Sequence, residues 1–450
     1  MAKETTYDMT KGNPVRLLIL FTIPMLLGNV VQQLYSSVDS IVVGHFVSVE
    51  AMAAIGATSA MLYFFLNMAI GLSNGLGIVM SQYFGAKNMT MLQKASANAL
   101  IVTTFSGIVM GGLGMLLARP LLELMQTPDD IINMSHLYIS ISYGGMIFML
   151  AYNISSSILR AVGNSRTPLY FLILSSLLNI ALDLLFVLVF HWDVAGVAIA
   201  TITAQAFSAL CSFIYIFRHY PMLRFKLRDM KPNWEIIGRV VKIGLPMGLQ
   251  SGCFAAGMMV IQATINSYGT AIVAGYTAAV RVETLTWMLP TTIGTSISNY
   301  AGQNAGAKDI ARIQKGVKAA VIICIIASLA STVFVYITGT SLLKLFIDNE
   351  PEIMKVAQEF LFVNATFYVF IGLIMIYNGT LRGIGIVGLP MISAFIELFL
   401  KVGGALFLSY LFGYFGIWFA EPLGWILGTI PSAIYYYKGA WKKTVLELKV

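Results

Sequence analysis

The sequence predicts an all-α integral membrane protein, with twelve transmembrane helices in two six-helix lobes. Three observations predict it: a very apolar composition, basic residues confined to alternate connections, and motifs that recur at a near-constant spacing. The 450 residues are 58% hydrophobic and 11% charged, with a mean hydropathy of +0.80. These values lie outside the range of soluble domains. Such a chain needs lipid around it.

Apolar stretches long enough to cross a bilayer recur along the whole chain. A helical span needs about 20 apolar residues at a rise of 1.5 Å per residue. The stretches are continuous and contain small residues, whereas barrel strands show short alternating segments. The expected helices therefore lie near 15–44, 52–78, 92–118, 131–157, 167–190, 194–217, 236–266, 271–299, 313–338, 353–380, 388–411 and 414–437.

The net charge of +8 raises the question of nucleic-acid binding, and the location of the basic residues answers it. Of 28 Lys and Arg residues, 23 lie at the termini, in connections that follow even-numbered helices, or in the flanks of these regions. The opposite side holds Arg119, Lys344 and Lys355. This asymmetry predicts a multi-pass protein of the cell (inner) membrane, with both termini and the loop 218–231 in the cytoplasm. We expect contact with membrane lipids and no nucleic-acid partner.

An internal repeat divides the chain into two halves. The spacing between matching motifs is nearly constant, which indicates duplication. Two pairs share one spacing, Pro24 with Pro246 and Leu159–Pro168 with Leu381–Pro390, and two more deviate from it only slightly, Gly85–Lys87 with Gly306–Lys308 and Gly196 with Gly416. The repeat predicts an amino-terminal lobe at 1–217, a cytoplasmic linker at 218–235 and a carboxyl-terminal lobe at 236–450.

The number of helices in each repeat predicts how the lobes are related. Six is an even number, so both halves enter the membrane from the same side. We therefore expect a pseudo-twofold axis along the membrane normal. Parallel repeats of this kind commonly enclose a substrate site near the bilayer midplane and expose it to either side in turn.

Several segments carry a resemblance to a known family. They are "NPVRLLILFTIPMLLGNVVQQLYSSVDSIVVG", "SQYFGAKN" with its partner "GQNAGAKD", and "LRAVGNSRTPLYFLILSSLLNIALD". These segments resemble the multidrug and toxic compound extrusion (MATE) family, in particular its bacterial MepA-like group, and the resemblance covers nearly the whole chain. It implies two six-helix lobes in a V that export organic, often cationic, small molecules in exchange for protons or sodium ions.

Asp39 is the first candidate for an ion-coupling residue. An ionisable residue within a span costs about 2.5–3.5 kcal/mol on insertion scales, so each one is a functional candidate. Asp39 ends a polar stripe with Gln32, Tyr35 and Ser36, whose spacing puts all four on one helix face. We expect this face to line the substrate cavity. The alternative is an interfacial Asp39, because the apolar run from Val15 exceeds the hydrocarbon thickness.

Asn179 and Asp183 are the second part of the candidate site. They share a face at i, i+4 in the fifth expected helix. The family resemblance implies that these positions, with Asp39, form a cation site in the amino lobe. Asn179 alone would also suit a hydrogen bond between helices. The sequence does not choose between a proton and sodium as the coupling ion.

The carboxyl half carries different charged residues within its spans: Arg281, Glu283, Glu397 and Lys401. Glu397 and Lys401 are spaced i, i+4, so we expect them to neutralise each other, with substrate binding as the alternative. The NorM-like branch of the family has carboxylates in its seventh and tenth helices. This chain has none in mid-span there, so a sodium site in the carboxyl lobe is not expected.

The repeat also predicts which half carries the ion. At the spacing that relates Pro24 to Pro246, Asp39 corresponds to Ile261, Asp183 to Ala405 and Asn179 to Lys401. The second half therefore lacks matching carboxylates and places a cation where a cation ligand would lie. We expect ion coupling in the amino half alone.

The leading functional hypothesis is a monomeric cation-coupled antiporter for drugs or organic cations, with no cofactor, no bound metal and no enzymatic activity. A lipid-linked oligosaccharide flippase is the first alternative, but it needs several cavity Arg or Lys residues to hold a pyrophosphate. Only Arg281 and Lys401 qualify. A membrane-embedded enzyme, the second alternative, needs a cluster of convergent catalytic groups, which the sequence does not show. The four histidines have no metal-ligand spacing.

Overall fold

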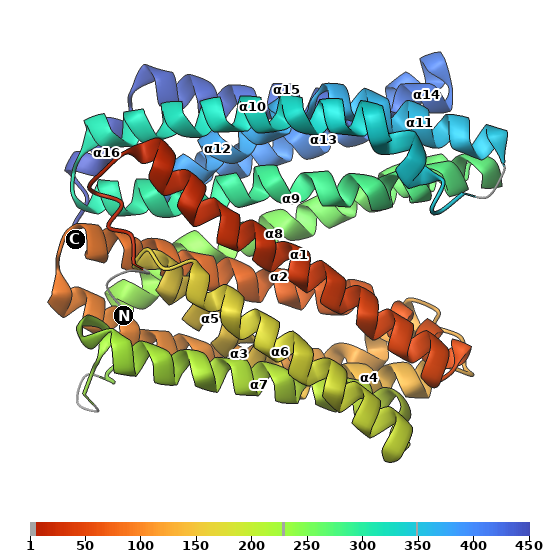
Figure 1. Cartoon of the computed structure of the whole chain (residues 1–450), viewed down its shortest axis with the longest axis horizontal. Coiled ribbons are helices and arrows are strands. Elements are labelled where there is room, and N and C mark those ends of the chain that lie inside the picture. The colour runs from red at the N-terminus through yellow and green to blue at the C-terminus, as the bar shows by residue number, and fades with distance from the viewer. Residues whose placement is uncertain (1–5, 227–229, 348–349) are drawn as a thin grey trace. The chain divides into compact units, whose positions relative to one another are not determined.

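The computed structural model describes residues 6–226, 230–347 and 350–450, and over these ranges it contains helices and no strand (Figure 1). Residues 227–229 of the expected linker lie outside the described residues. The first half of the chain forms α1 (Pro14–Phe46), α2 (Val49–Gly85), α3 (Met89–Leu124), α4 (Ile132–Gly144), α5 (Met146–Ala161), α6 (Arg166–Leu184), a π-helical turn (Leu185–Val189) and α7 (Asp193–His219).

The second half follows the same order of helices. After a 3-10 turn (Pro221–Leu223) it forms α8 (Trp234–Asn266), α9 (Thr270–Gly306), α10 (Ile310–Leu343), α11 (Pro351–Thr366), α12 (Tyr368–Ile384), α13 (Gly388–Phe412), α14 (Tyr414–Ile417), α15 (Ala420–Lys438) and α16 (Trp441–Leu446).

Each expected span corresponds to one helix or to two consecutive helices. In the described part of the chain, eight helices are long and apolar enough to cross a membrane, or up to ten spans if each of two bent pairs counts as one. The bends are 46° between α4 and α5 and 48° between α11 and α12, at matching places in the two repeats. Helices α9 and α15 are not among these spans, and each contains a buried glutamate, Glu283 and Glu421.

The repeat is also visible in the turns that begin α3 and α10. Lys87 and Lys308 adopt left-handed backbone angles, with φ of +57° and +56°. The next residues, Asn88 and Asp309, cap the helices, because each side chain accepts a hydrogen bond from the backbone N–H three residues on, at 3.1 and 2.9 Å. The same local conformation therefore starts the third helix of each repeat.

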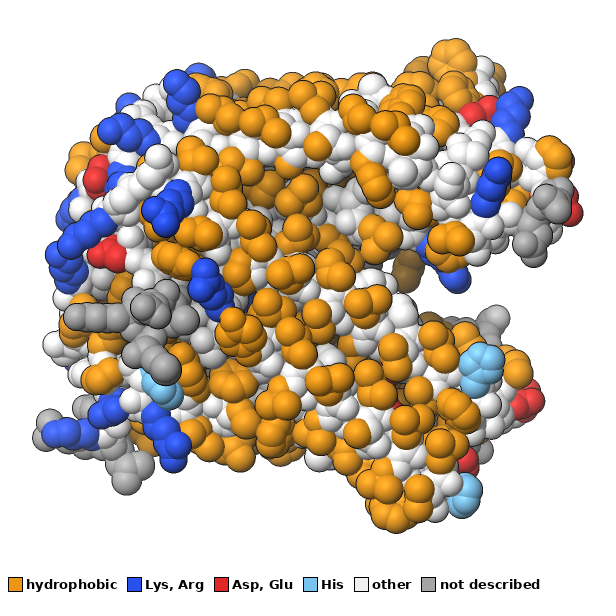
Figure 2. All heavy atoms as spheres, viewed as in Figure 1, with side chains coloured by type: hydrophobic (Ala, Val, Ile, Leu, Met, Phe, Trp, Pro, Cys, Tyr) orange, Lys and Arg blue, Asp and Glu red, His pale blue; other side chains and the backbone are white. Residues whose placement is uncertain are grey.

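The flanks of both units are apolar. Many large hydrophobic side chains are exposed, among them Leu116 (75%), Ile337 (73%) and Phe399 (73%). Figure 2 shows hydrophobic side chains covering the long sides of the helices, with most Lys and Arg side chains near one end. Continuous exposed apolar surface of this kind is unfavourable in water and suits a bilayer.

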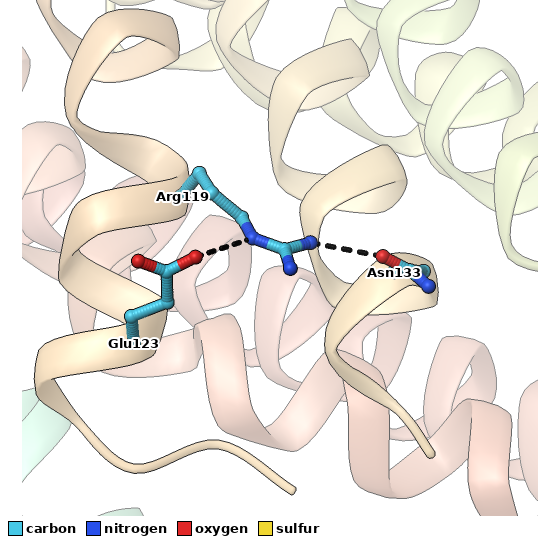
Figure 3. A network of polar contacts seen from close by, with 3 residues as sticks. All are labelled: Arg119, Glu123 and Asn133. Carbon is cyan, nitrogen blue, oxygen red and sulfur yellow. Dashed lines mark hydrogen bonds and ion pairs between the residues drawn. The ribbon is translucent and has the colours of Figure 1, made fainter. Parts of the chain in front are cut away.

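At the other end of the helices, Arg119 connects α3 to the start of α4 (Figure 3). Its Nε donates to Glu123 at 2.8 Å and its Nη1 donates to Asn133 at 2.9 Å. The Arg119 and Glu123 side chains are 44% and 59% exposed, so water screens their attraction. The contact orders the connection and adds little stability.

The chain forms two compact units, and their boundaries run through α1 and α8. The amino unit contains Met1–Asp8 and Ile23–Gly248, and the carboxyl unit contains Met9–Thr22 and Leu249–Val450. The first part of α1 therefore belongs to the carboxyl unit, and the first part of α8 to the amino unit. The boundaries expected from the repeat placed each helix in one lobe. Both changes of unit occur close to a proline, Pro24 or Pro246, where a helix lacks one backbone hydrogen bond.

Within the amino unit, α2 and the first part of α8 cross at glycines. A Cβ atom on Gly71 would lie 2.5 Å from the backbone nitrogen of Gly248, and one on Gly75 would lie 2.7 Å from that of Gly244. Small residues spaced four apart allow two helices to approach this closely. At the corresponding place in the carboxyl unit, Thr22 Oγ1 donates to Ser296 Oγ at 2.9 Å.

The amino-terminal segment is anchored by backbone hydrogen bonds. In the amino unit, Tyr7 N–H donates to the Gly163 carbonyl at 3.0 Å. In the carboxyl unit, Met9 is fully buried, its N–H donates to Gln303 Oε1 at 2.9 Å, and its carbonyl accepts from Arg312 Nε at 2.9 Å. Residues 7–9 are therefore an integral part of the fold.

Candidate ion site and buried charges

The amino unit brings Asp39, Asn179 and Asp183 together. Asp39 comes from α1, whereas Asn179 and Asp183 lie one turn apart on α6, directly before the π-helical turn. Asn179 and Asp183 are fully buried, and Asp39 is partly buried. A π-helical turn often lies next to a functional site, because it rotates the residues beside it.

Asn179 connects the two carboxyl groups. In the amide orientation that satisfies its neighbours, Nδ2 donates to Asp39 Oδ1 and to Asp183 Oδ2, each at 3.0 Å. Its Oδ1 then accepts from the Thr201 N–H of α7 at 3.2 Å. We prefer this orientation to the reverse, in which Nδ2 reaches Thr201 Oγ1 at 3.4 Å, because ionised carboxylates can only accept hydrogen bonds.

The carboxyl groups of Asp39 and Asp183 also lie within hydrogen-bonding reach of each other. Two carboxylates this close repel each other unless they share a proton or bind a cation between them. Asp183 Oδ1 is buried and has no hydrogen-bond partner in the described part of the chain. The two carboxyl groups therefore form a site that suits the binding and release of one monovalent cation.

Two hydroxyl residues complete the surroundings of the carboxyl groups, and sequence reasoning missed both. Thr201 holds the Asn179 amide and accepts a hydrogen bond from Tyr35 Oη at 3.3 Å, while Tyr138 interacts electrostatically with both aspartates. Within the predicted polar stripe of α1, Tyr35 and Asp39 lie at the site. The other two members, Gln32 and Ser36, are exposed on the unit.

In the carboxyl unit, the expected pairing of Lys401 with Glu397 is wrong. Lys401 Nζ lies 2.5 Å from Glu421 Oε1, and both side chains are almost fully buried. Glu421 belongs to α15, so the partner comes from a neighbouring helix rather than from the next turn of α13. In the sequence repeat, Lys401 corresponds to Asn179 of the amino unit.

Of the other charged candidates in this half, two glutamates interact with the Lys401–Glu421 pair and the arginine does not. Glu283 and Glu397 are buried, at 4% and 8% exposure, and both interact electrostatically with Lys401 and Glu421. Arg281 is exposed and lies over the Phe346 ring at 6.0 Å. Ile261 and Ala405, the counterparts of the two aspartates, belong to the hydrophobic core.

A family model for MatE matches residues 24–185 and again residues 246–407. The two matches have equal length and begin at Pro24 and Pro246, the pair that marks the repeat, so they confirm the duplication. Together they cover more than half of the chain. This chain belongs to the MATE family. It is 31% identical over 440 residues to the probable multidrug resistance protein YpnP of Bacillus subtilis, covering 97% of this chain and 98% of that one.

Other MATE family proteins and solved structures are more distant in sequence. The multidrug export protein MepA of Staphylococcus saprophyticus is 20% identical, with 86% of this chain and 85% of that one covered. A multidrug resistance MATE transporter of the MOP superfamily, solved outward-facing, matches with a TM-score of 0.90, 22% identity, and 97% and 98% coverage. A MOP superfamily transporter from Pyrococcus furiosus with a binding pocket of reversed polarity matches at 0.89, with 21% identity and 98% of each chain covered. These likenesses confirm the two-lobe MATE fold.

Described residues contain no group of three or more His, Cys, Asp or Glu side chains that could hold a metal ion. The amino-unit site instead offers two carboxyl groups and an amide. This donor set suits a proton, or a sodium ion bound by oxygen ligands. We therefore call Asp39, Asn179 and Asp183 the candidate ion site.

Proposed function

We propose that this MATE family member is a cation-coupled antiporter of the bacterial inner membrane, which exports several organic cations in exchange for protons or sodium ions. The observation that carries the proposal is the candidate ion site, where one amide bridges two carboxyl groups at 3.0 Å each. A proton or sodium ion bound there neutralises the site and changes the packing of α1 against α6, which biases alternating access. The names of YpnP and MepA support export of several compounds.

The flippase alternative is less well supported. A lipid pyrophosphate needs several unpaired cationic side chains in one cavity. Lys401 is engaged by Glu421, and Arg281 lies apart over an aromatic ring. A cavity lined by soft and aromatic side chains would instead suit amphipathic cations. We propose that the protein acts as a monomer, because the candidate ion site is built within one unit of one chain.

Reconstituted vesicles test the proposed exchange. With a lipophilic cation as substrate, wild-type protein should accumulate the cation in the vesicles when an opposing proton or sodium gradient is imposed. This accumulation should stop when the gradient is collapsed. Imposing the two gradients separately identifies the ion. Flux that continues down the substrate gradient with neither ion present would indicate a channel, and no transport of any lipophilic cation would remove the proposed substrate class.

The orientation of the chain is tested by labelling. In a background without Cys211, Cys253 and Cys324, a thiol in place of Lys226 should stay unlabelled by an impermeant reagent in intact cells, because the basic loop should face the cytoplasm. A thiol in place of Asp129, in an exposed connection with few basic residues, should react. The opposite pattern would reverse the proposed topology.

A further inference from the structure

The carboxyl unit holds a buried ammonium group inside a cage of rings and carboxyl groups. Lys401 Nζ lies 2.5 Å from Glu421 Oε1 and 3.2 Å from the sulfur of Met258. It also lies over the Phe254 ring at 4.6 Å and the Trp287 ring at 6.0 Å. Phe254, Met258 and Trp287 are only partly buried, so they form the rim of this cage.

The cage occupies the place that corresponds to the candidate ion site of the amino unit. Asn179 and Lys401 hold the same position within the two family matches. Thr201 follows Gly196 by as many residues as Glu421 follows Gly416, so the glycine pair of the repeat relates Thr201 to Glu421. The contact between Asn179 and Thr201 in the amino unit is therefore replaced by the ion pair of Lys401 and Glu421 in the carboxyl unit.

The donors around Lys401 indicate which cation the cage accepts. Sodium and divalent ions prefer several oxygen ligands, whereas aromatic faces and a thioether attract an organic ammonium group. The cluster contains three acids, Glu283, Glu397 and Glu421, which interact with a single lysine, so acids outnumber the ammonium group. Glu283 Oε1 and Glu421 Oε2 are buried without a hydrogen-bond partner in the described part of the chain. These oxygens favour a cation in the cage.

We propose that the Lys401 ammonium is a built-in occupant of a site for a monovalent alkylammonium ion, at the carboxyl unit's counterpart of the candidate ion site. The correspondence rests on the proposed role of Asp39, Asn179 and Asp183. The lysine keeps this site filled throughout the transport cycle. Only the amino unit then exchanges an ion with solution, although both units contain a cation site.

Removal and replacement of the ammonium group test the proposal. In purified full-length protein, Lys401→Ala should lower the melting temperature by about 5 °C or more, because it leaves Glu421 buried without its partner. The deleted atoms correspond to n-propylammonium. Adding n-propylammonium should restore more than half of the loss, whereas sodium chloride at equal ionic strength or 1-propanol should not.

The matched control is Lys355→Ala, which breaks an exposed ion pair with Glu359 in the same unit. Its melting temperature should not respond specifically to n-propylammonium. Equal recovery of Lys401→Ala by 1-propanol would show an apolar cavity, and no recovery by n-propylammonium would show no ammonium site. Either result overturns the proposal.

If Lys401→Ala does not fold, a second variant allows the same comparison of ligands. Lys401→Ala with Glu421→Gln removes one positive and one negative charge, so the net charge of the cluster is unchanged, and n-propylammonium should still stabilise the variant more than 1-propanol through Glu283, Glu397 and the rings. Equal stabilisation would contradict the proposal. Melting does not depend on export: recovery without vesicle transport would reject the proposed function alone, and transport without recovery would reject the built-in cation alone.

Discussion

Asp39→Asn and Asp183→Asn should each abolish gradient-driven export in reconstituted vesicles, reducing it at least about tenfold, to the level without a gradient. Asparagine resembles a protonated aspartate in shape and can still accept the hydrogen bond from Asn179. Because asparagine has no ionisable carboxyl group, it cannot take up and release the cation that the site exchanges. The protein should therefore fold and insert but lose the link between ion movement and export.

The matched control for these variants is Asp193→Asn, at an exposed aspartate of the same unit. Its backbone φ of +46° is one that asparagine tolerates well. Asp193→Asn should export like wild type, and Glu397→Gln in the carboxyl unit should retain at least part of the coupling. Wild-type export by both Asp39→Asn and Asp183→Asn under the same gradient would move the coupling site elsewhere, with Glu283 and Glu397 as the next candidates.

Gly75→Ala should destabilise the amino unit by about 1–3 kcal/mol through overpacking. The added methyl would lie 2.7 Å from the backbone of α8 at Gly244 and Val240, and backbone atoms cannot move aside as a side-chain tip can. The helices would have to separate at their closest crossing. Thermal unfolding of purified protein in detergent measures the effect as a lower melting temperature.

Gly56→Ala, in the same helix, is the matched control. Its added methyl has nothing within 4 Å, and the residue is exposed. Alanine is the better helix former by roughly 0.5–1 kcal/mol, so this variant should be neutral or slightly stabilised. Gly75→Ala should therefore lower the melting temperature, whereas Gly56→Ala should leave it unchanged or raise it slightly. A Gly75→Ala protein that melts like Gly56→Ala would show that the crossing tolerates a wider separation.

The helical membrane fold and its duplication could be predicted from sequence, because each leaves a recognisable sequence pattern. Hydrophobic length indicates a span, and the recurrence of Pro24 at Pro246 indicates the repeat. The bends at α4–α5 and α11–α12 were not expected, since the apolar runs continue through them. That the first part of α1 belongs to the carboxyl unit, and the first part of α8 to the amino unit, was not expected either. Contacts over long sequence separations leave no periodic signal in the sequence.

The candidate site was predicted in part. Asp39 and Asp183 stand out because acids are rare in spans, and the structure brings them together. Thr201 and Tyr138 were missed, since hydroxyl residues are common in membrane helices and carry no such signal. Lys401 was paired with Glu397 because the i, i+4 rule sees one helix only, whereas its partner, Glu421, lies on another.

The shared segments of α1 and α8 also have a consequence for biosynthesis. Thr22 emerges early from the ribosome, but its hydrogen-bond partner Ser296 follows 274 residues later. At about 5–20 residues per second, the start of the first helix precedes the surface it completes by on the order of tens of seconds. The two halves of the duplicated gene therefore depend on each other, since neither half alone encodes a complete unit. Fission of the gene between α7 and α8 would yield two polypeptides that have to meet in the membrane before either is whole.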